Sequence, residues 1–267
     1  MAIVETEKRG EVFILRLNRP ERLNALNAGL WSAMADAFLA FQECRETEVA
    51  ILTGAGRAFC AGEDLKEAHE LGKPGGRGPR ADDPFFWRRL EKPVIGALNG
   101  HAMGGGFMLA ERTDLRLAVP GALFEVSEAK RWLVGGFEHG HIANLPHAIA
   151  TEMALGFRFP SERLYELGFI NRIVAPEALM GAAMAMAQQL LDLPPASRVN
   201  TMHMMRELRP ALTADQKTLG AELKNHGAKS DLVEIRAAFV EKRRPNFKGW
   251  DRPEDRYELP VLKKTTV

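Results

Sequence analysis

The chain has 267 residues, of which 46% are hydrophobic and 27% charged, a composition that is ordinary for a folded globular protein and argues against disorder. Its 36 Lys and Arg residues against 35 Asp and Glu residues give a net charge of +1, which argues against a nucleic-acid partner. With only two cysteines, no visible signal peptide and no apolar run long enough to span a membrane, the chain is expected to be cytoplasmic.

The first half of the chain alternates between predicted strands and helices. Residues 12–17 form a predicted strand, and residues 27–41 carry apolar side chains at three- and four-residue steps, which indicates an amphipathic helix. Continuous apolar runs at 49–53, 93–98 and 115–119 are typical of parallel strands that are buried on both faces. This order predicts an α/β fold with a parallel sheet.

A stretch rich in glycine and proline separates two of these strands. Residues 72–79 are predicted to form a mobile surface loop, because this composition does not hold regular structure. Phe85, Phe86 and Trp87 follow the loop. These three aromatic side chains either pack beneath the loop or form an apolar lid over a ligand, and the sequence leaves both interpretations open.

The last third of the chain is predicted to be helical. The apolar pattern places helices at 178–191, 215–226 and 230–243, and two adjacent prolines separate the first from the others. The division that we expect is a core, 1–195, and a helical C-terminal region, 196–267.

The densest chemical signal is a buried strand that runs into Gly104, Gly105 and Gly106 and then into an apolar helix. Glycine is unfavourable inside a helix, so the triplet needs a reason. Either the strand and the helix cross tightly, or a ligand lies against bare backbone, where helix-terminal N–H groups stabilise a developing negative charge. The spacing does not match the dinucleotide-binding pattern, so we expect no nicotinamide cofactor.

A second glycine-containing stretch, 57–67, follows another predicted strand. Its small residues allow a ligand to approach the main chain. Cys60 lies within it and has no obvious basic neighbour to activate the thiol, so we expect a buried and unreactive cysteine.

In this order, and about forty residues apart, the two stretches resemble those of the enoyl-CoA hydratase/isomerase (crotonase) family. The resemblance extends over most of the chain and includes residues 17–26, 49–54, 92–100 and 238–243. It implies a crotonase-like spiral of ββα repeats with a helical C-terminal region that forms a homotrimer or a dimer of trimers. It also implies an acyl-CoA thioester as substrate, with no separate cofactor and no metal ion.

The resemblance further implies that two backbone N–H groups bind the thioester oxygen and stabilise an enolate. Matching the motifs assigns these groups to Ala61 and Gly105. The residues expected along the coenzyme A moiety are Arg22, Leu23, Ala25, Gly62, Asp64 and Leu65. The residues expected around the acyl group are His101, Gly104, Met108 and Trp132.

The chain departs from the family pattern at one of two glutamates. The first stands two residues after the glycine triplet, where this chain has Met108, a thioether that does not exchange protons. The second matches Glu128, which we expect to act as general acid or base. The alternative is a glutamate that begins a helix or pairs with Lys130 or Arg131.

The turn at 135–141 also departs from the family pattern. Glu138 is a second candidate for proton transfer, with His139 or His141 nearby, and the alternative is a polar start of a helix. A metal site is not expected here, because a full ligand set is lacking.

The leading hypothesis is an acyl-CoA enzyme of hydratase/isomerase type, a lyase or an isomerase, that uses the Ala61 and Gly105 amides with Glu128. A catalytically silent paralogue that binds CoA esters is the alternative from another class. Thioester hydrolysis and decarboxylation also stay open, as does the identity of the acyl group.

Overall fold

The fold is that of a computed structural model, in which residues 2–65, 67 and 78–262 are described. Most of the predicted loop at 72–79 lies outside the described residues. Contacts between Cα atoms divide the chain into two units, and each unit is considered by itself. Unit 1 comprises Met1–Glu125 and Arg158–Arg209, and unit 2 comprises Val126–Phe157 and Pro210–Val267.

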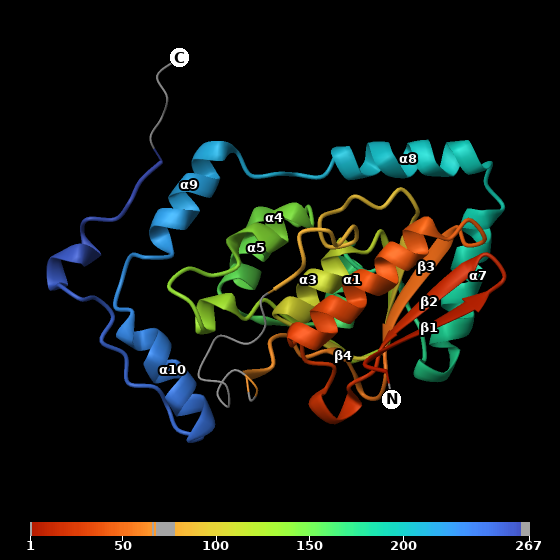
Figure 1. The fold of residues 1–267 in the computed structure, drawn as a ribbon. Helices are drawn as coiled ribbons and strands as arrows, with labels where there is room; N and C mark the ends of the chain where they lie inside the picture. The colour runs from red at the N-terminus through yellow and green to blue at the C-terminus, as the bar shows by residue number, and fades with distance from the viewer. Residues whose placement is uncertain (1, 66, 68–77, 263–267) are drawn as a thin grey trace, which may run out of the picture. The chain divides into compact units, whose positions relative to one another are not determined.

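Unit 1 contains a six-stranded sheet in the order β1-β2-β3-β5-β7-β10 (Figure 1). Its strands are β1 (Val4–Arg9), β2 (Val12–Leu17), β3 (Val49–Gly54), β5 (Val94–Leu98), β7 (Leu115–Ala118) and β10 (Arg172–Ile173). β1 pairs with β2 in antiparallel orientation, and the other pairs are parallel. The four strands predicted at 12–17, 49–53, 93–98 and 115–119 are confirmed. β1 was not predicted, because this edge strand is mostly exposed and has few apolar residues.

A second, four-stranded sheet in unit 1 has the order β4-β6-β8-β9. Its strands are β4 (Ala58–Cys60), β6 (His101–Met103), β8 (Leu123–Glu125) and β9 (Arg158–Pro160). Along the chain β4 follows β3, β6 follows β5 and β8 follows β7, so each turn places one strand in each sheet. This winding confirms the predicted crotonase-like spiral.

Helices and short 3₁₀ segments connect the strands of unit 1. They are η1 (Pro20–Arg22), α1 (Ala28–Glu43), α3 (Gly105–Arg112), α6 (Ser161–Glu166), η3 (Pro176–Ala178), α7 (Leu179–Leu191) and α8 (Pro195–Glu207). α1 begins where the sequence pattern predicts, because the Asn27 side chain accepts a hydrogen bond from the Leu30 N–H at 2.8 Å. Its buried face includes Met34, Phe38 and Phe41, at the spacing that identified the helix.

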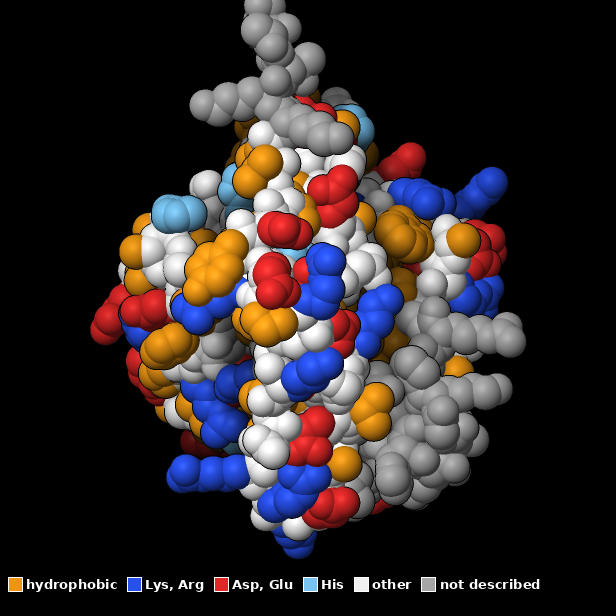
Figure 2. All heavy atoms as spheres, turned by 90° about the vertical axis from the view of Figure 1, so that its left-hand side faces the viewer, with side chains coloured by type: hydrophobic (Ala, Val, Ile, Leu, Met, Phe, Trp, Pro, Cys, Tyr) orange, Lys and Arg blue, Asp and Glu red, His pale blue; other side chains and the backbone are white. Residues whose placement is uncertain are grey.

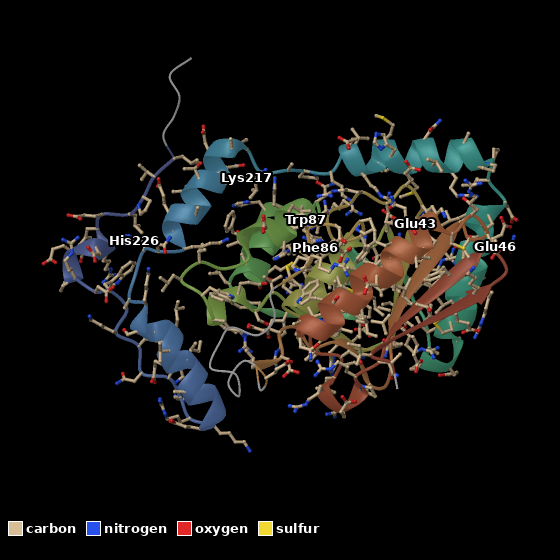
Figure 3. All side chains as sticks on the ribbon, in the orientation of Figure 1. Glu43, Glu46, Phe86, Trp87, Lys217 and His226 are labelled. Carbon is tan, nitrogen blue, oxygen red and sulfur yellow. The ribbon has the colours of Figure 1, made fainter. Side chains whose placement is uncertain are left out.

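Two of the three adjacent aromatic residues pack onto α1. Phe85 stacks on Phe38 with ring centroids 4.2 Å apart, and Phe86 meets Trp31 edge-on at 5.5 Å. Trp87 is 47% exposed and its indole N–H donates to a backbone carbonyl at 2.8 Å (Figure 3). Phe85 and Phe86 therefore belong to the core, which favours the packing interpretation over the lid.

Unit 2 consists of helices and irregular segments. They are η2 (Glu128–Lys130), α4 (Phe137–Ile142), α5 (His147–Ala154), α9 (Ala214–Leu223), α10 (Ser230–Val240) and η4 (Pro253–Arg256). α4 packs closely on α5, because a Cβ atom at Gly140 would lie 2.6 Å from the Ala150 Cα atom. Gly220 of α9 likewise faces the ring of Phe137, since a Cβ atom there would lie 2.7 Å from the ring edge. The helices predicted at 215–226 and 230–243 are confirmed with shorter C-terminal ends.

The observed units differ from the division expected at residue 195. α8 belongs to unit 1, because its buried Arg198 donates to Glu48 at 2.8 Å and its Arg206 binds Asp114 at 2.6 Å. Residues 126–157 instead group with the C-terminal segment. The functional division into a thioester-binding core and a trimerisation region stays a prediction.

Hydrophobic side chains are interspersed with charged side chains of both signs on the face drawn in Figure 2. The large exposed hydrophobic residues of α10 and the segment after it are Val233, Phe247, Tyr257, Leu259, Val261 and Leu262. Across the described ranges, none of the helices combines the length and the hydropathy that crossing a bilayer requires.

Candidate active site

The segment after η1 runs alongside the turn that follows β4. The Leu26 N–H donates to the Gly62 carbonyl at 2.7 Å, and the Asp64 N–H donates to the Leu26 carbonyl at 3.0 Å. Glu63 thereby forms a parallel bridge with Leu26. The two segments that the resemblance places along coenzyme A are therefore neighbours in unit 1.

The same pairing corrects one of the predicted oxyanion donors. The Ala61 N–H donates to the Leu23 carbonyl at 3.0 Å, so it is engaged in a backbone hydrogen bond and does not point toward a ligand. The assignment of Ala61 as a donor to the thioester oxygen is therefore wrong. Because the residues on either side of Glu63 bond to Leu26, the N–H of Glu63 is directed to the opposite side of the segment.

Gly62 and Gly105 lie close together at the ends of two neighbouring parallel strands, β4 and β6. Gly62 has a φ angle of +83°, and a Cβ atom there would lie 2.5 Å from the Met103 carbonyl oxygen and 3.3 Å from the Gly105 nitrogen. Gly105 is the first residue of α3, so helix geometry provides no intrahelical acceptor for its N–H. The turn after β4 thus passes beside a helix-terminal N–H group.

The structure also gives packing reasons for the glycine triplet. Gly104 has a φ angle of +50° and donates its N–H to β8 at 2.7 Å. A Cβ atom at Gly106 would lie 2.1 Å from the Cys60 carbonyl oxygen, whereas one at Gly105 would meet the Leu26 Cδ1 atom at 2.6 Å. The positive φ angle therefore accounts for Gly104 and a tight crossing for Gly106, while the nearest neighbour of Gly105 is the flexible end of a side chain.

We expect Gly106→Ala to lower the free energy of unfolding by about 3 kcal/mol or more, because the new methyl group would overlap backbone rather than a movable side chain. Gly181→Ala on α7 is the matched control, since no atom lies within 4 Å of its new Cβ. That variant should be neutral or more stable by about 0.5–1 kcal/mol. Urea unfolding followed by circular dichroism measures both, and equal midpoints would contradict the clash.

Asp64 holds the turn after β4 to the segment before it. Its side chain is 4% exposed, and its Oδ2 atom lies 2.9 Å from Nη2 of Arg19. Arg19 also donates to the Ala25 carbonyl at 2.5 Å. The sequence analysis missed Arg19 as the partner that fixes both segments. The expected contact of Asp64 with coenzyme A stays a prediction.

The remaining residues expected along coenzyme A lie in the same part of unit 1. Arg22 ends η1 and is half-buried, and Leu23 after it has a φ angle of 52°. Ala25 is buried, and Leu65 is half-buried at the end of the turn. These residues therefore lie on the two neighbouring backbone segments, the one after η1 and the turn after β4. Their contacts with coenzyme A stay predictions.

Met108 and His101 border the glycine triplet in different ways. The Met108 Cε atom lies 3.6 Å from the Cβ position of Gly105, so its thioether methyl group covers that residue. His101 is exposed, and its Nδ1 atom accepts a hydrogen bond from the Leu123 N–H at 2.9 Å. This bond links β6 to β8, and the role of His101 as a wall of the acyl pocket stays a prediction.

The two cysteines differ in burial and in the pKa of their thiols. Cys60 is fully buried, and burial raises the pKa of its thiol to about 12, which agrees with the expected unreactive cysteine. The neighbouring Thr47 hydroxyl, the Glu46 backbone and Lys8 lower the pKa of Cys44 to about 7.

The catalytic carboxylate expected from the sequence lies in unit 2. Glu128 begins η2, and its side chain is 21% exposed. Its Oε1 atom lies 3.7 Å from Nε2 of the buried His139, and its buried Oε2 atom has no hydrogen-bond partner within the described ranges. A Cβ atom at Gly136 would lie 2.6 Å from His139 and 3.2 Å from Glu128, so a glycine makes this approach possible. A buried carboxylate oxygen without a partner is costly and is typical of a functional group.

Trp132 lies four residues after Glu128 and is 42% exposed. Its backbone N–H donates to the Glu128 carbonyl at 2.8 Å. The Trp132 side chain borders a cavity of about 270 Å³ in unit 2, whose other walls include Leu133, Phe247 and Trp250. This cavity is mainly aromatic and aliphatic and is a candidate for the apolar pocket expected around the acyl group.

Comparisons with known proteins agree with this geometry. The sequence pattern described as enoyl-CoA hydratase/isomerase matches residues 7–251. The carnitinyl-CoA dehydratase of Escherichia coli (strain SMS-3-5 / SECEC) is 35% identical over 262 residues, which cover 91% of this chain and 97% of that protein. This chain belongs to the enoyl-CoA hydratase/isomerase family.

Solved structures of the family support the same conclusion. The carnitinyl-CoA hydratase of Mycobacterium avium has a TM-score of 0.78 and 29% identity, with 93% of this chain and 99% of that chain covered. The enoyl-CoA hydratase of Mycobacterium tuberculosis H37Rv has a TM-score of 0.71 and 33% identity, with coverage of 92% and 98%. The protein is thus an acyl-CoA enzyme of hydratase/isomerase type with the crotonase fold.

The turn around α4 carries Glu138, His139 and His141, which the sequence analysis placed near one another. His139 follows Glu138 in sequence, but its ring faces Glu128 instead. Glu138 lies half-buried in the first turn of α4, and His141 is exposed. Within the part of the chain that is described, no three His, Cys, Asp or Glu side chains are grouped to hold a metal ion.

Proposed function

We propose that this enzyme interconverts a 2-enoyl-CoA and a 3-hydroxyacyl-CoA, with Glu128 exchanging the proton at the α carbon. The buried, unpartnered oxygen of Glu128 beside His139 is the observation that carries this proposal, because such an oxygen is poised to accept a proton. The names of the related dehydratases and hydratases support the same reaction class.

Removing the α proton places negative charge on the thioester oxygen. The Gly105 N–H at the start of α3 is proposed to bind this oxygen, aided by the positive end of the helix dipole. A second N–H is proposed from Glu63, which its bridge with Leu26 directs away from the segment that engages Ala61. Losing one such donor typically raises the barrier by about 3 kcal/mol.

Met108 leaves this enzyme without the first of the two glutamates that the family pattern carries. A single carboxylate can take the α proton and return it to the leaving hydroxyl group, so that water departs and the carbon–carbon double bond forms. Glu138 in unit 2 is the other proposed proton donor. Both routes release one water molecule. The single-carboxylate route regenerates the starting protonation state, whereas the route through Glu138 leaves the α proton on Glu128 and requires one proton exchange with solvent at each carboxyl group.

The second candidate function is movement of a double bond along the acyl chain, and Met108 is the observation that favours it. An isomerase needs one group that carries a proton between the α and γ carbons, and it does not need to position water. Glu128 is sufficient for that task.

Incubating the enzyme in deuterium oxide with short, long and aromatic enoyl-CoAs and with carnitinyl-CoA tests these proposals. Mass spectrometry of hydratase products should show the mass of added water with deuterium at the α carbon. An isomerase should give a product to which no water has been added and which carries deuterium at the α or γ carbon. Binding without any turnover of these thioesters would contradict both proposals and support the silent paralogue.

We propose that the enzyme assembles as a homotrimer or as a dimer of trimers. The exposed hydrophobic residues of α10 and the segment after it support this, since such side chains are commonly covered when subunits associate. Light scattering on the full-length protein measures the mass, and a monomer would contradict the proposal.

A further inference from the structure

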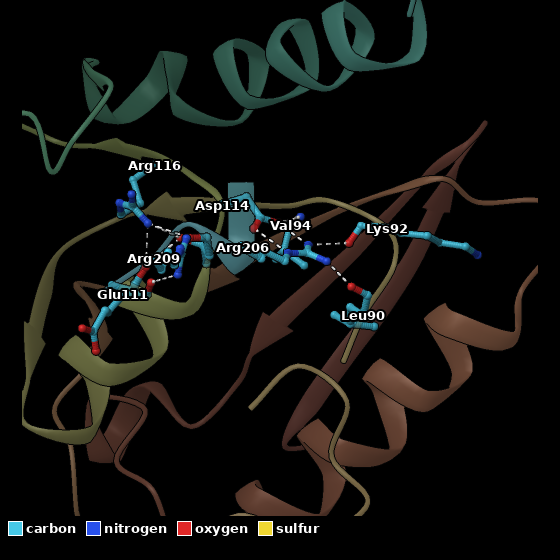
Figure 4. A network of polar contacts seen from close by, with 10 residues as sticks. Leu90, Lys92, Val94, Glu111, Asp114, Arg116, Arg206 and Arg209 are labelled. Carbon is cyan, nitrogen blue, oxygen red and sulfur yellow. Dashed lines mark hydrogen bonds and ion pairs between the residues drawn. The ribbon is translucent and has the colours of Figure 1, made fainter. Parts of the chain in front are cut away.

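Five arginines gather around one small region of unit 1. Figure 4 shows the polar contacts of three of them, Arg116, Arg206 and Arg209. They are Arg88, Arg112, Arg116, Arg206 and Arg209. The carboxylates that interact with them are Asp83, Glu111 and Asp114. Glu111 lies 3.9 Å from Arg112. Among the described side chains that these interactions involve, five positive groups face three negative ones, a surplus of positive charge that burial makes costly.

The carboxylate of Asp114 is paired with one of these arginines, Arg206. Its two oxygens accept hydrogen bonds from Nε of Arg206 at 3.0 Å and from Nη2 at 2.6 Å, and one of them also accepts from the Val94 N–H at 2.8 Å. This two-point pairing is the strong geometry for an arginine and a carboxylate. The charge of Asp114 is therefore committed to Arg206.

Backbone carbonyls satisfy the N–H groups of other members without cancelling their charge. Arg116 donates to the Phe169 carbonyl at 2.6 Å, and Arg209 donates to the Glu111 and Thr113 carbonyls at 3.2 Å each. Burial lowers the pKa of Arg116 to about 10 and also lowers the pKa of Arg209, with repulsion between the arginines adding to the effect. These hydrogen bonds satisfy the N–H groups, but the carbonyl acceptors carry no net negative charge.

Arg88 is half-buried and has a φ angle of 56°, so the turn that carries it holds it in a left-handed conformation. Among the described residues, no hydrogen-bond acceptor or carboxylate lies within bonding distance of its guanidinium group. Arg88 borders a cavity whose other walls are Phe85, Leu90, Val94, Arg112, Asp114, Arg206 and Arg209. The space open to the centre of a water-sized sphere is about 10 Å³, enough for a single small ion or a water molecule.

We propose that this cavity binds one small monovalent anion of the size of chloride, held by Arg88 together with Arg112 and Arg209. The positive charge around the cavity favours an anion, and the small volume favours a monatomic ion over a phosphate group. The site lies among residues that the acyl-CoA proposal does not use, so the two proposals stand or fall separately.

Thermal unfolding of the full-length protein tests the site when chloride replaces gluconate at constant ionic strength, which keeps general screening unchanged. Once chloride saturates the site, we expect the midpoint of thermal unfolding to rise by roughly 3 °C or more. An anion that binds only the folded state stabilises the folded state. In Arg88→Met this rise should be lost. Arg89→Met is the matched control and should keep the rise, because Arg89 does not border the cavity and donates to the Ala81 carbonyl.

Crystals of the wild-type protein soaked in bromide provide a direct measurement that does not depend on the stability of a variant. An anomalous peak between Arg88, Arg112 and Arg209 is expected. Equal midpoints in chloride and gluconate, an equal chloride response in Arg88→Met, or a cavity filled by water or by an acidic side chain of a second copy would overturn the proposal.

Discussion

We expect Glu128→Gln to lower kcat by roughly 10³-fold with every acyl-CoA that the wild type converts. The amide has nearly the shape of the carboxylate, but it does not accept the α proton at neutral pH. Steady-state kinetics measure kcat, and isothermal titration with a non-reactive acyl-CoA thioether measures binding. The dissociation constant should change by less than about threefold, because the charge of Glu128 is assigned to the chemical step and not to the nucleotide.

Glu138→Gln is the matched control for this prediction, since it makes the same change in the first turn of α4. A loss in Glu138→Gln that equals or exceeds the loss in Glu128→Gln would move the essential proton transfer to Glu138. Full activity in Glu128→Gln would remove the carboxylate from the mechanism. In either case the fold and the family would stand, and only the assignment of the base would change.

Two substitutions at Gly105 distinguish the effect of losing its N–H donor from the effect of adding side-chain bulk. Gly105→Pro removes the N–H group, and proline is tolerated at the first position of a helix because that N–H has no intrahelical acceptor. We expect kcat/KM to fall by roughly 10²- to 10³-fold, which is the usual cost of one oxyanion donor. The measurement is steady-state kinetics with the best thioester from the substrate panel.

Gly105→Ala is the matched control, because it adds a Cβ atom near the Leu26 Cδ1 atom and keeps the N–H group. Its activity should stay well above that of Gly105→Pro, and circular dichroism should show that both variants are folded. Equal losses in the two variants would indicate that crowding at Leu26, and not the missing donor, lowers the rate.

Several parts of the fold were accessible from the sequence because their determinants are local. Continuous apolar runs identified the buried parallel strands, and the spacing of Leu30, Met34 and Phe38 identified α1. Cys60 was expected to be an unreactive buried thiol, and its raised pKa agrees. The short strands of the second sheet were missed, because three-residue strands carry too little pattern to be recognised.

Residue order by itself indicated an α/β fold and, through the ordered motifs, the family. The resemblance to that family then implied the spiral of repeats and identified Met108 as the position of the first glutamate. Tertiary structure alone decided which backbone and side-chain groups are already engaged within the fold. The N–H of Ala61 is taken by Leu23, and His139 faces Glu128 although it follows Glu138 in sequence. The physical reason is that the direction of an N–H or a side chain depends on pairing with a segment far along the chain, and no local pattern of residues encodes that partner.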